Sequence, residues 1–155
     1  MSDEPRPGRV LGIDLGIKRT GLAVSDELRL TVRRLENLTP KSRAEDVAYL
    51  VELCDELDVR DVVVGHPVLP QSGEEGPMAR RARNFAAVLE QALRERRSET
   101  RVHLKDETGS SLEAARRLVE SGVKRSKRRA ALDGEAARVL VEEFLLAPPR
   151  APPSE

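Results

Sequence analysis

Two short apolar runs near the N-terminus, at residues 10–15 and 21–24, are the feature that most constrains the fold. Runs of this length and β-rich composition are typical of buried strands. The segment between them contains Gly16 and polar residues, which favours a turn. We therefore expect a β-hairpin, with Asp14 close to its open end.

Asp14 needs a partner in such a strand, because an unpaired buried charge costs several kcal/mol. One interpretation pairs its carboxylate with Lys18 or Arg19 in a structural ion pair. The other makes Asp14 one of several carboxylates that hold a divalent cation, which requires further acids from elsewhere in the chain. The hairpin sequence leaves both interpretations open.

The remaining patterns predict a mixed α/β sheet. Residues 30–35 alternate apolar and polar side chains, which indicates a third, half-exposed antiparallel strand. Two later β-rich runs, at 61–65 and 101–105, follow helical patterns at 42–57 and from Pro77, as expected for parallel strands joined by crossover helices. Two more helices are predicted, one from Ser110 to near Gly122 and one that carries Leu132, Ala136, Val139, Leu140 and Phe144. The expected sheet has three antiparallel strands and then two parallel ones.

Composition limits the class of protein. A chain of 155 residues fits one domain, expected at 9–147, with flexible ends at 1–8 and 148–155. Its 27 basic and 27 acidic residues cancel, so attraction to nucleic acid must come from local clusters. The single cysteine, Cys54, excludes an internal disulfide framework and lies on an apolar helical stripe, so we expect it to be buried. No membrane-length apolar run or signal-like start is present, and we expect a soluble, cytoplasmic protein.

Acidic residues recur at the ends of the predicted strands. Asp106 and Glu107 follow the last strand, and ligands of open sheets collect beyond the carboxyl ends of parallel strands, where Asp14 also lies. Neighbouring strand residues point to opposite faces, so only one of this pair can face Asp14. Asp133 on the last helix is a third candidate, although a helix cap or a solvated acid would explain it equally well. Three carboxylates would suit Mg²⁺ or Mn²⁺, which can activate water for attack on a phosphodiester.

Basic residues gather in two places beside these acids. The first, called here the basic segment, consists of Lys124, Arg125, Lys127, Arg128 and Arg129; the second contains Arg80, Arg81 and Arg83. A solvated face is the usual explanation of a charge run, but two runs beside an acidic site favour binding of phosphate backbones. We interpret His66 as incidental and His103 as an alternating strand residue.

Several motifs together resemble those of a known family. They are Leu-Gly-Ile-Asp-Leu-Gly at 11–16 with Lys18 and Arg19, Ala-Val-Ser-Asp at 23–26, Val-Val-Gly-His-Pro at 63–67, Asp-Glu-Thr at 106–108, and Leu-Asp at 132–133 followed by Ala-Ala at 136–137. The chain resembles the YqgF/RuvX family of RNase H-like proteins, described as Holliday junction resolvases or pre-16S rRNA nucleases. The resemblance implies an RNase H-like α/β fold, with helices on both faces of the five-stranded sheet. It also implies a site for Mg²⁺ or Mn²⁺ whose catalytic, metal-binding acids are Asp14, Glu107 and Asp133.

The function implied by the resemblance is a metal-dependent nuclease that acts in 5′-end processing of pre-16S rRNA or in resolution of branched DNA. Nucleic acid is the expected partner, a membrane is not, and a homodimer remains open. The residues expected to contact nucleic acid are Lys18, Arg19, Arg80, Arg81 and the basic segment. One alternative is a nucleotide-phosphate binder, because the hairpin also resembles the phosphate loops of sugar kinases and actin-like ATPases; those enzymes close two such domains around the nucleotide. The other is a noncatalytic nucleic-acid-binding or ribosome-assembly protein with the same fold.

Overall fold

Five strands form one mixed sheet, in the order β3-β2-β1-β4-β5. The computed structural model describes residues 8–67, 74–106 and 125–146, with side chains in the last range from residue 134 onward. Its elements are β1 (Arg9–Leu15), β2 (Thr20–Ser25), β3 (Val32–Arg34), α1 (Arg43–Glu56), β4 (Val59–His66), α2 (Pro77–Glu95), β5 (Arg101–Asp106) and α4 (Arg125–Leu146). β1, β2 and β3 pair antiparallel, and β1, β4 and β5 pair parallel. The predicted mixed sheet is thus confirmed, whereas the predicted helix at 110–122 lies outside the described residues.

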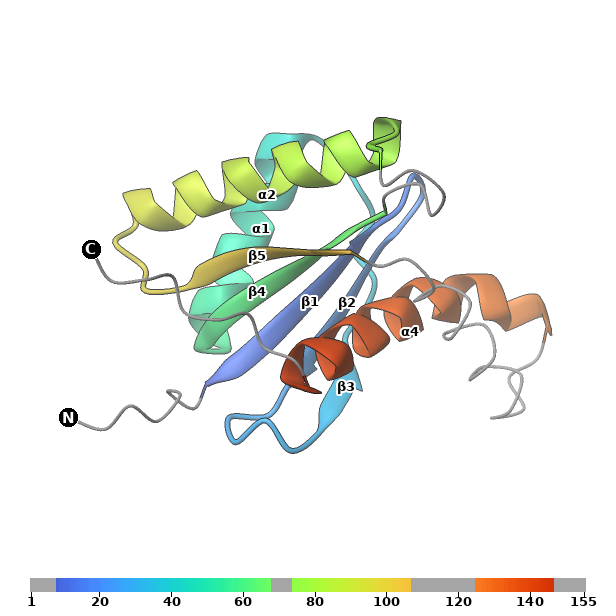
Figure 1. The fold of residues 1–155 in the computed structure, drawn as a ribbon, viewed down its shortest axis with the longest axis horizontal. Coiled ribbons are helices and arrows are strands. Elements are labelled where there is room, and N and C mark those ends of the chain that lie inside the picture. The colour runs from blue at the N-terminus through green and yellow to red at the C-terminus, as the bar shows by residue number, and fades with distance from the viewer. Residues whose placement is uncertain (1–7, 68–73, 107–124, 147–155) are drawn as a thin grey trace.

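Helices cover both faces of this sheet (Figure 1). On one face, Leu11 and Ile13 of β1 pack in a core with buried residues of α1 and α2. On the other face, Val10 packs with Leu140 and Phe144 of α4. Successive residues of β1 therefore point to alternate faces, as a strand requires. This alternation determines which helix each polar residue of the sheet faces.

The first hairpin forms as predicted, but the expected place of Asp14 within it is wrong. Asp14 pairs with Gly21 and Leu15 pairs with Thr20, so Asp14 lies beside the turn, at the closed end of the hairpin. The turn is tight at Gly16, where a Cβ atom would lie 2.2 Å from the carbonyl oxygen of Arg19. Glycine permits this close approach, so both strands continue almost to the turn.

The third strand is shorter than the predicted run at 30–35, since β3 spans only Val32–Arg34. The cause is the Asp26 carboxylate, which accepts hydrogen bonds of 2.7 Å from the backbone nitrogens of Leu30 and Thr31. These bonds hold the preceding residues in a turn, as Asp side chains commonly do. They lower the pKa of Asp26, with the bond from Thr31 as the largest cause.

The helix boundaries follow the capping signals of the sequence. Ser42 caps α1 by accepting a hydrogen bond of 3.1 Å from the backbone nitrogen of Glu45, and Pro77 occupies the first position of α2. α4 begins at Arg125, so the interpretation of Asp133 as a helix cap is wrong. None of the helices in the described part of the chain is long and apolar enough to cross a membrane.

Candidate active site

Asp14 occupies the carboxyl end of β1, where its side chain is partly buried. Alternation along β1 places it on the same face as Val10 and Gly12, which α4 covers. Gly12 marks the closest approach, because a Cβ atom there would lie 2.5 Å from Cγ2 of Val141 and 2.8 Å from the carbonyl oxygen of Ala137. The candidate carboxylate therefore lies beneath α4, at the end of the sheet where β1 and β4 terminate.

The direction of α4 brings position 133 toward the same end. Val10 packs against Leu140 and Phe144, and Gly12 lies against Ala137 and Val141, so α4 runs antiparallel to β1. Position 133 precedes Ala137 by about one helical turn, in the direction in which β1 proceeds from Gly12 to Asp14. The helix thus carries position 133 toward Asp14, while the side chain of Asp133 lies outside the described residues.

Asp106 is the last residue of β5, and its face follows from the alternation along that strand. Val102 packs against the core beneath α1 and α2, whereas His103 contacts Phe144 of α4. By alternation Asp106 shares the face of Val102, which is opposite to the face of Asp14. Glu107 lies outside the described residues, and its place in the site stays a prediction. Among the residues with described side chains, no group of three His, Cys, Asp or Glu is arranged to hold a metal ion.

Lys105 shares the face of Asp14, a feature that the sequence patterns did not single out. Its Nζ lies 4.0 Å from Oε2 of Glu143 in α4, which confirms the face. Lys105 pairs with Gly65, and continuing the β1–β4 register by one residue places Gly65 beside Asp14. Gly65 is buried and has no side chain, and it separates Asp14 from Lys105, which lie about 10 Å apart at two strand spacings. The strand register could have identified this row once the pairing of β1, β4 and β5 was known.

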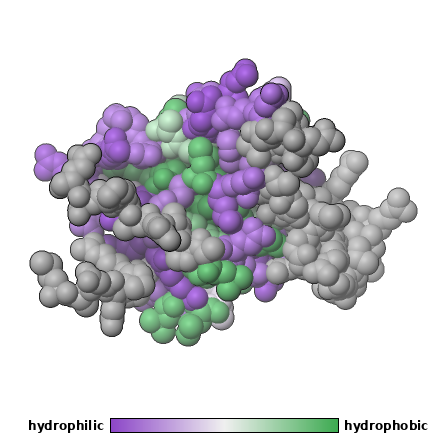
Figure 2. All heavy atoms as spheres, viewed as in Figure 1, coloured by the Kyte–Doolittle hydropathy of each residue, from purple (hydrophilic) through white to green (hydrophobic). Residues whose placement is uncertain are grey.

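The residues of the β1–β2 turn reach the other helical layer. Arg81 of α2 donates a hydrogen bond of 3.0 Å from Nη1 to the carbonyl oxygen of Gly16. Lys18 is exposed and Arg19 is partly buried, so the sequence prediction that both contact nucleic acid remains open. Arg80 is exposed on the surface of α2, whose visible side is mainly hydrophilic (Figure 2). The basic segment falls on residues whose side chains are not described.

His66 has a partner within the protein. Its Nε2 lies 2.9 Å from Oε1 of Glu75, and Nε of Arg83 lies 2.9 Å from the same oxygen. His66 follows Val62 and Val64 on the face of α1 and α2, away from the face of Asp14. Glu75 therefore lies between His66 and Arg83 and pairs with both, just before the start of α2. The sequence contained no spacing signal for this contact, because it joins a strand end to the residues just before a helix.

A second polar network lies toward the opposite end of β4. Asp61 accepts a hydrogen bond of 2.7 Å from Nη2 of Arg29, and its other oxygen lies 2.8 Å from Nε2 of His103. His103 alternates within β5 as predicted, and its ring also contacts Phe144 of α4, at 5.2 Å between centroids. Burial would raise the pKa of Asp61, but the hydrogen bonds from His103 and Arg29 outweigh it and hold that pKa below its ordinary value. The network joins the β2–β3 connection, β4, β5 and α4.

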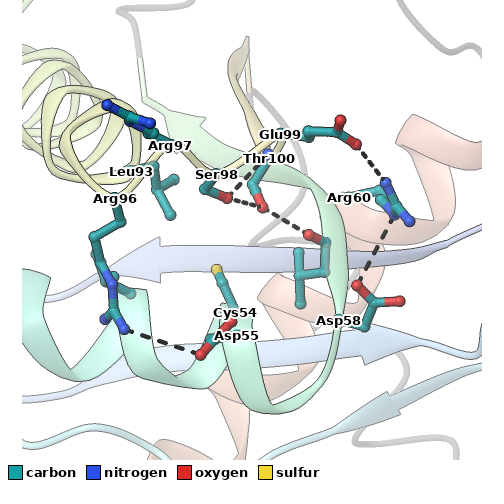
Figure 3. Close-up of a pocket in the computed structure, with 12 residues that line it drawn as sticks. Cys54, Asp55, Asp58, Arg60, Leu93, Arg96, Arg97, Ser98, Glu99 and Thr100 are labelled. Atoms are coloured by element: carbon teal, nitrogen blue, oxygen red, sulfur yellow. Dashed lines mark hydrogen bonds and ion pairs between the residues drawn. The ribbon is translucent and has the colours of Figure 1, made fainter.

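A polar cavity of about 380 Å³ lies at the same far end of the sheet (Figure 3). Its charged lining is balanced, with three arginines and three acids: Arg60, Arg96, Arg97, Asp55, Asp58 and Glu99. Cys54 also lines the cavity, is buried as predicted, and has its pKa raised to about 12, chiefly by burial. A thiol held protonated is a poor nucleophile. Neither the charge balance nor the cysteine indicates a catalytic centre here.

Comparisons with known proteins identify the family of this chain. A sequence profile described as "RuvX: Holliday junction resolvase" matches residues 8–147. The chain belongs to the RuvX family. Two relatives are named "Putative pre-16S rRNA nuclease". The one from Anaeromyxobacter dehalogenans strain 2CP-1 is 42% identical, and the match covers 88% of this chain and 96% of the relative. The one from Myxococcus xanthus is 39% identical, and the match covers 88% of this chain and 87% of the relative. The suspected family is therefore confirmed.

A solved structure supports the fold independently. The structure titled "T. thermophilus RuvC in complex with Holliday junction substrate" superposes with a TM-score of 0.57 at 19% identity, covering 90% of this chain and 94% of that one. At this level of identity the likeness shows a shared fold, and the RNase H-like prediction is confirmed. Membership of the family supports a nuclease related to Holliday junction resolvases and pre-16S rRNA nucleases.

Proposed function

We propose that this protein is a divalent-metal-dependent nuclease that hydrolyses phosphodiester bonds in structured nucleic acid. Its substrate would be precursor 16S rRNA at the 5′ end, branched DNA, or both. The observation that carries the proposal is the position of Asp14, a partly buried carboxylate at the carboxyl end of β1 on the face covered by α4. α4 brings position 133 toward that end, and strand register excludes Asp106 from that face.

The residues in this region fit a hard divalent cation. Asp14 offers carboxylate oxygens, the ligands that Mg²⁺ and Mn²⁺ prefer, and the two other acids proposed to hold the ion, Glu107 and Asp133, are of the same chemistry. When bound, such an ion supplies activation of water and stabilisation of charge on the phosphate. The chain itself contributes a partly buried acid on the α4 face of the sheet, with Lys105 two strands away on the same face.

Positive side chains around Asp14 support binding of a phosphate backbone. Lys105 lies on the face of Asp14, and the exposed Lys18 and Arg80 lie on the adjacent turn and helix. With Arg19 and the basic segment they form the proposed contact set; Arg81, also expected from the sequence to contact nucleic acid, donates a hydrogen bond to Gly16. The solved RuvC neighbour is titled as a complex with a Holliday junction, which is consistent with nucleic acid as the partner. Since aromatic residues make up only 2% of the chain, we expect phosphate contacts to contribute more affinity than base stacking.

Two alternatives make different predictions. A nucleotide-phosphate binder would use the β1–β2 turn to hold a nucleotide and would not cut a polynucleotide. A noncatalytic nucleic-acid-binding or ribosome-assembly protein would bind the same substrates without cleaving them. Binding and cleavage must therefore be measured separately.

The test uses Asp14→Asn, which preserves shape and removes the charge. The wild-type chain should cleave a precursor 16S rRNA fragment or a four-way DNA junction in the presence of Mg²⁺ or Mn²⁺. The variant should lose cleavage by about 100-fold or more, as expected for loss of a group that stabilises charge at the reacting phosphate. Its affinity for the same substrate without metal should hold or rise slightly, because an anion near the phosphate backbone has been removed.

Asp55→Asn is the matched control, since the Asp55 side chain is 80% exposed at the far end of the sheet. It should cleave at the wild-type rate. If Asp14→Asn cleaves at the wild-type rate, Asp14 is not part of the site. If this variant unfolds, a structural ion pair of Asp14 becomes the better explanation. A wild-type chain that binds both substrates but cleaves neither would support the noncatalytic alternative.

A further inference from the structure

Arg81 makes a contact that links α2 to the turn beside Asp14. Its guanidinium donates through Nη1 to the carbonyl oxygen of Gly16 at 3.0 Å, across 65 positions of sequence. Gly16 lies two residues after Asp14. Hydrogen bonds from a charged group are stronger than those between neutral groups. This contact therefore restrains the segment that ends β1.

The same turn is restrained from its other side. Thr20, the first residue of β2, exchanges two backbone hydrogen bonds with Leu38, of 2.8 and 2.9 Å. Gly16 itself has little room, because a Cβ atom would lie 2.2 Å from the carbonyl oxygen of Arg19. With Arg81 in place, both ends of the turn are held. These contacts restrict movement of the turn and therefore of the adjacent Asp14 carboxylate.

Arg81 differs from the neighbouring arginines of α2 in its contacts. It lies in the second turn of the helix, and no acid occupies the first turn. Nearby, Arg83 is engaged by Glu75 and Arg80 is exposed. Arg81 is instead partly buried and reaches the turn from the α2 face, opposite to the face of Asp14. The guanidinium of Arg81 therefore contacts the turn backbone on the side of the sheet opposite to the Asp14 carboxylate.

We propose that Arg81 is a positioning residue that ties α2 to the β1–β2 turn and so fixes Asp14 at the end of β1. This role rests on the proposed function for the importance of Asp14. In this role Arg81 acts through the protein backbone, in place of the phosphate contact that the sequence led us to expect. Catalytic groups must be held closely in place, since a misplacement of about 1 Å can reduce the rate about 100-fold.

The decisive variant is Arg81→Met, which keeps an unbranched apolar stem and removes the donors. It should lower kcat by about 100-fold, with KM and metal-free substrate affinity within about twofold of the wild-type values and an unchanged salt slope. Mn²⁺ affinity, measured by electron paramagnetic resonance without substrate, should also fall. Arg81→Lys, which retains a charged donor, should recover part of both losses.

Two other arginines of α2 provide the comparison. Arg94→Met is the matched control, because Arg94 pairs with Glu90 in the last turn of α2, at 2.6 Å, and is 71% exposed. It should leave kcat, affinity and Mn²⁺ binding unchanged. Arg80→Met should show the behaviour of a phosphate contact, with weaker binding and a salt slope reduced by about 1. The positioning and phosphate-contact roles thus differ in which quantity changes.

Several results would overturn the proposal. If Arg81→Met weakens metal-free binding and flattens the salt slope while kcat is retained, Arg81 is a phosphate contact. If kcat, KM and Mn²⁺ affinity all match the wild type, the contact with Gly16 has no role at the site. Circular dichroism tests folding, and if Arg81→Met unfolds, the milder Arg81→Lys decides between the same outcomes. If the wild-type chain cleaves no substrate, the proposed function fails on its own, and the positioning role is judged by Mn²⁺ affinity alone.

Discussion

Gly12→Ala tests the contact that places α4 over Asp14. A Cβ atom at position 12 would lie 2.5 Å from Cγ2 of Val141 and 2.8 Å from the carbonyl oxygen of Ala137. The valine methyl group can move by rotation about its side-chain bond, but the carbonyl oxygen belongs to the backbone of α4. The helix must therefore shift away from β1 to accept the extra atom.

The expected loss of stability comes from two opposing effects. Overpacking of this kind costs about 1–3 kcal/mol. Replacement of glycine by alanine restricts the unfolded chain and returns about 0.4–1 kcal/mol. With both effects near the middle of their ranges the net loss should be about 1–2 kcal/mol, and at about 2–4 °C per kcal/mol for a chain of this size the melting temperature should fall by roughly 2–8 °C. Differential scanning calorimetry measures this change directly.

Gly76→Ala is the matched control for this substitution. Gly76 precedes α2 with a φ of −83°, and a Cβ atom there would meet no atom of the described chain within 4 Å. Its stability should remain within about 1 kcal/mol of the wild type. In Gly12→Ala, displacement of α4 should also reduce cleavage at temperatures where the variant is fully folded. An unchanged melting temperature for Gly12→Ala would show that α4 does not approach β1 at this point.

Three further predictions concern groups outside that contact. Native Cys54 should resist alkylation at pH 8 and react on unfolding, because burial raises its pKa to about 12; rapid labelling of the folded chain would contradict its burial. Asp61→Asn should destabilise the protein by about 1–3 kcal/mol at pH 7. The lowered pKa of Asp61 means that its contribution is present above the unfolded value and is lost as the pH falls through the native one, so the two melting curves should converge in acid. Alanine at the last three positions of the basic segment should weaken binding equally for unrelated nucleic-acid sequences and flatten its salt dependence; unchanged affinity would leave the segment as a solvated face.

The sequence predicted those features that depend on neighbours along the chain. Apolar periodicity identified the strands and helices, Ser42 and Pro77 indicated where helices start, and the apolar stripe predicted burial of Cys54. The third strand was predicted too long because alternation continues through residues 30–31. The Asp26 carboxylate binds the backbone nitrogens of both residues, and this local competition with strand pairing is not visible in a hydrophobic pattern.

Contacts between distant segments could not be predicted in the same way. His103 with Asp61, His66 with Glu75, and Arg81 with Gly16 each join elements whose relative placement depends on the whole sheet. A lone histidine or one arginine in a run gives no spacing signal for its partner. Asp14 and Glu107 were identified as site candidates by family motifs and strand ends. Lys105 emerges only from the parallel register that aligns it with Gly65.

The charges around Asp14 predict that the two proposed ligands, a divalent cation and a nucleic acid, affect each other's binding. The Asp14 end carries the exposed Lys18 and Arg80, and Lys105 there pairs with Glu143. A nucleic acid bound at this end would meet the proposed metal-binding acids, which repel it until a cation neutralises them. Metal and nucleic acid should consequently strengthen each other's binding, and linkage requires the same factor in both directions. Replacement of Asp14 by asparagine removes part of the repulsion together with a metal ligand, so this mutual strengthening should shrink even though metal-free binding of nucleic acid is preserved.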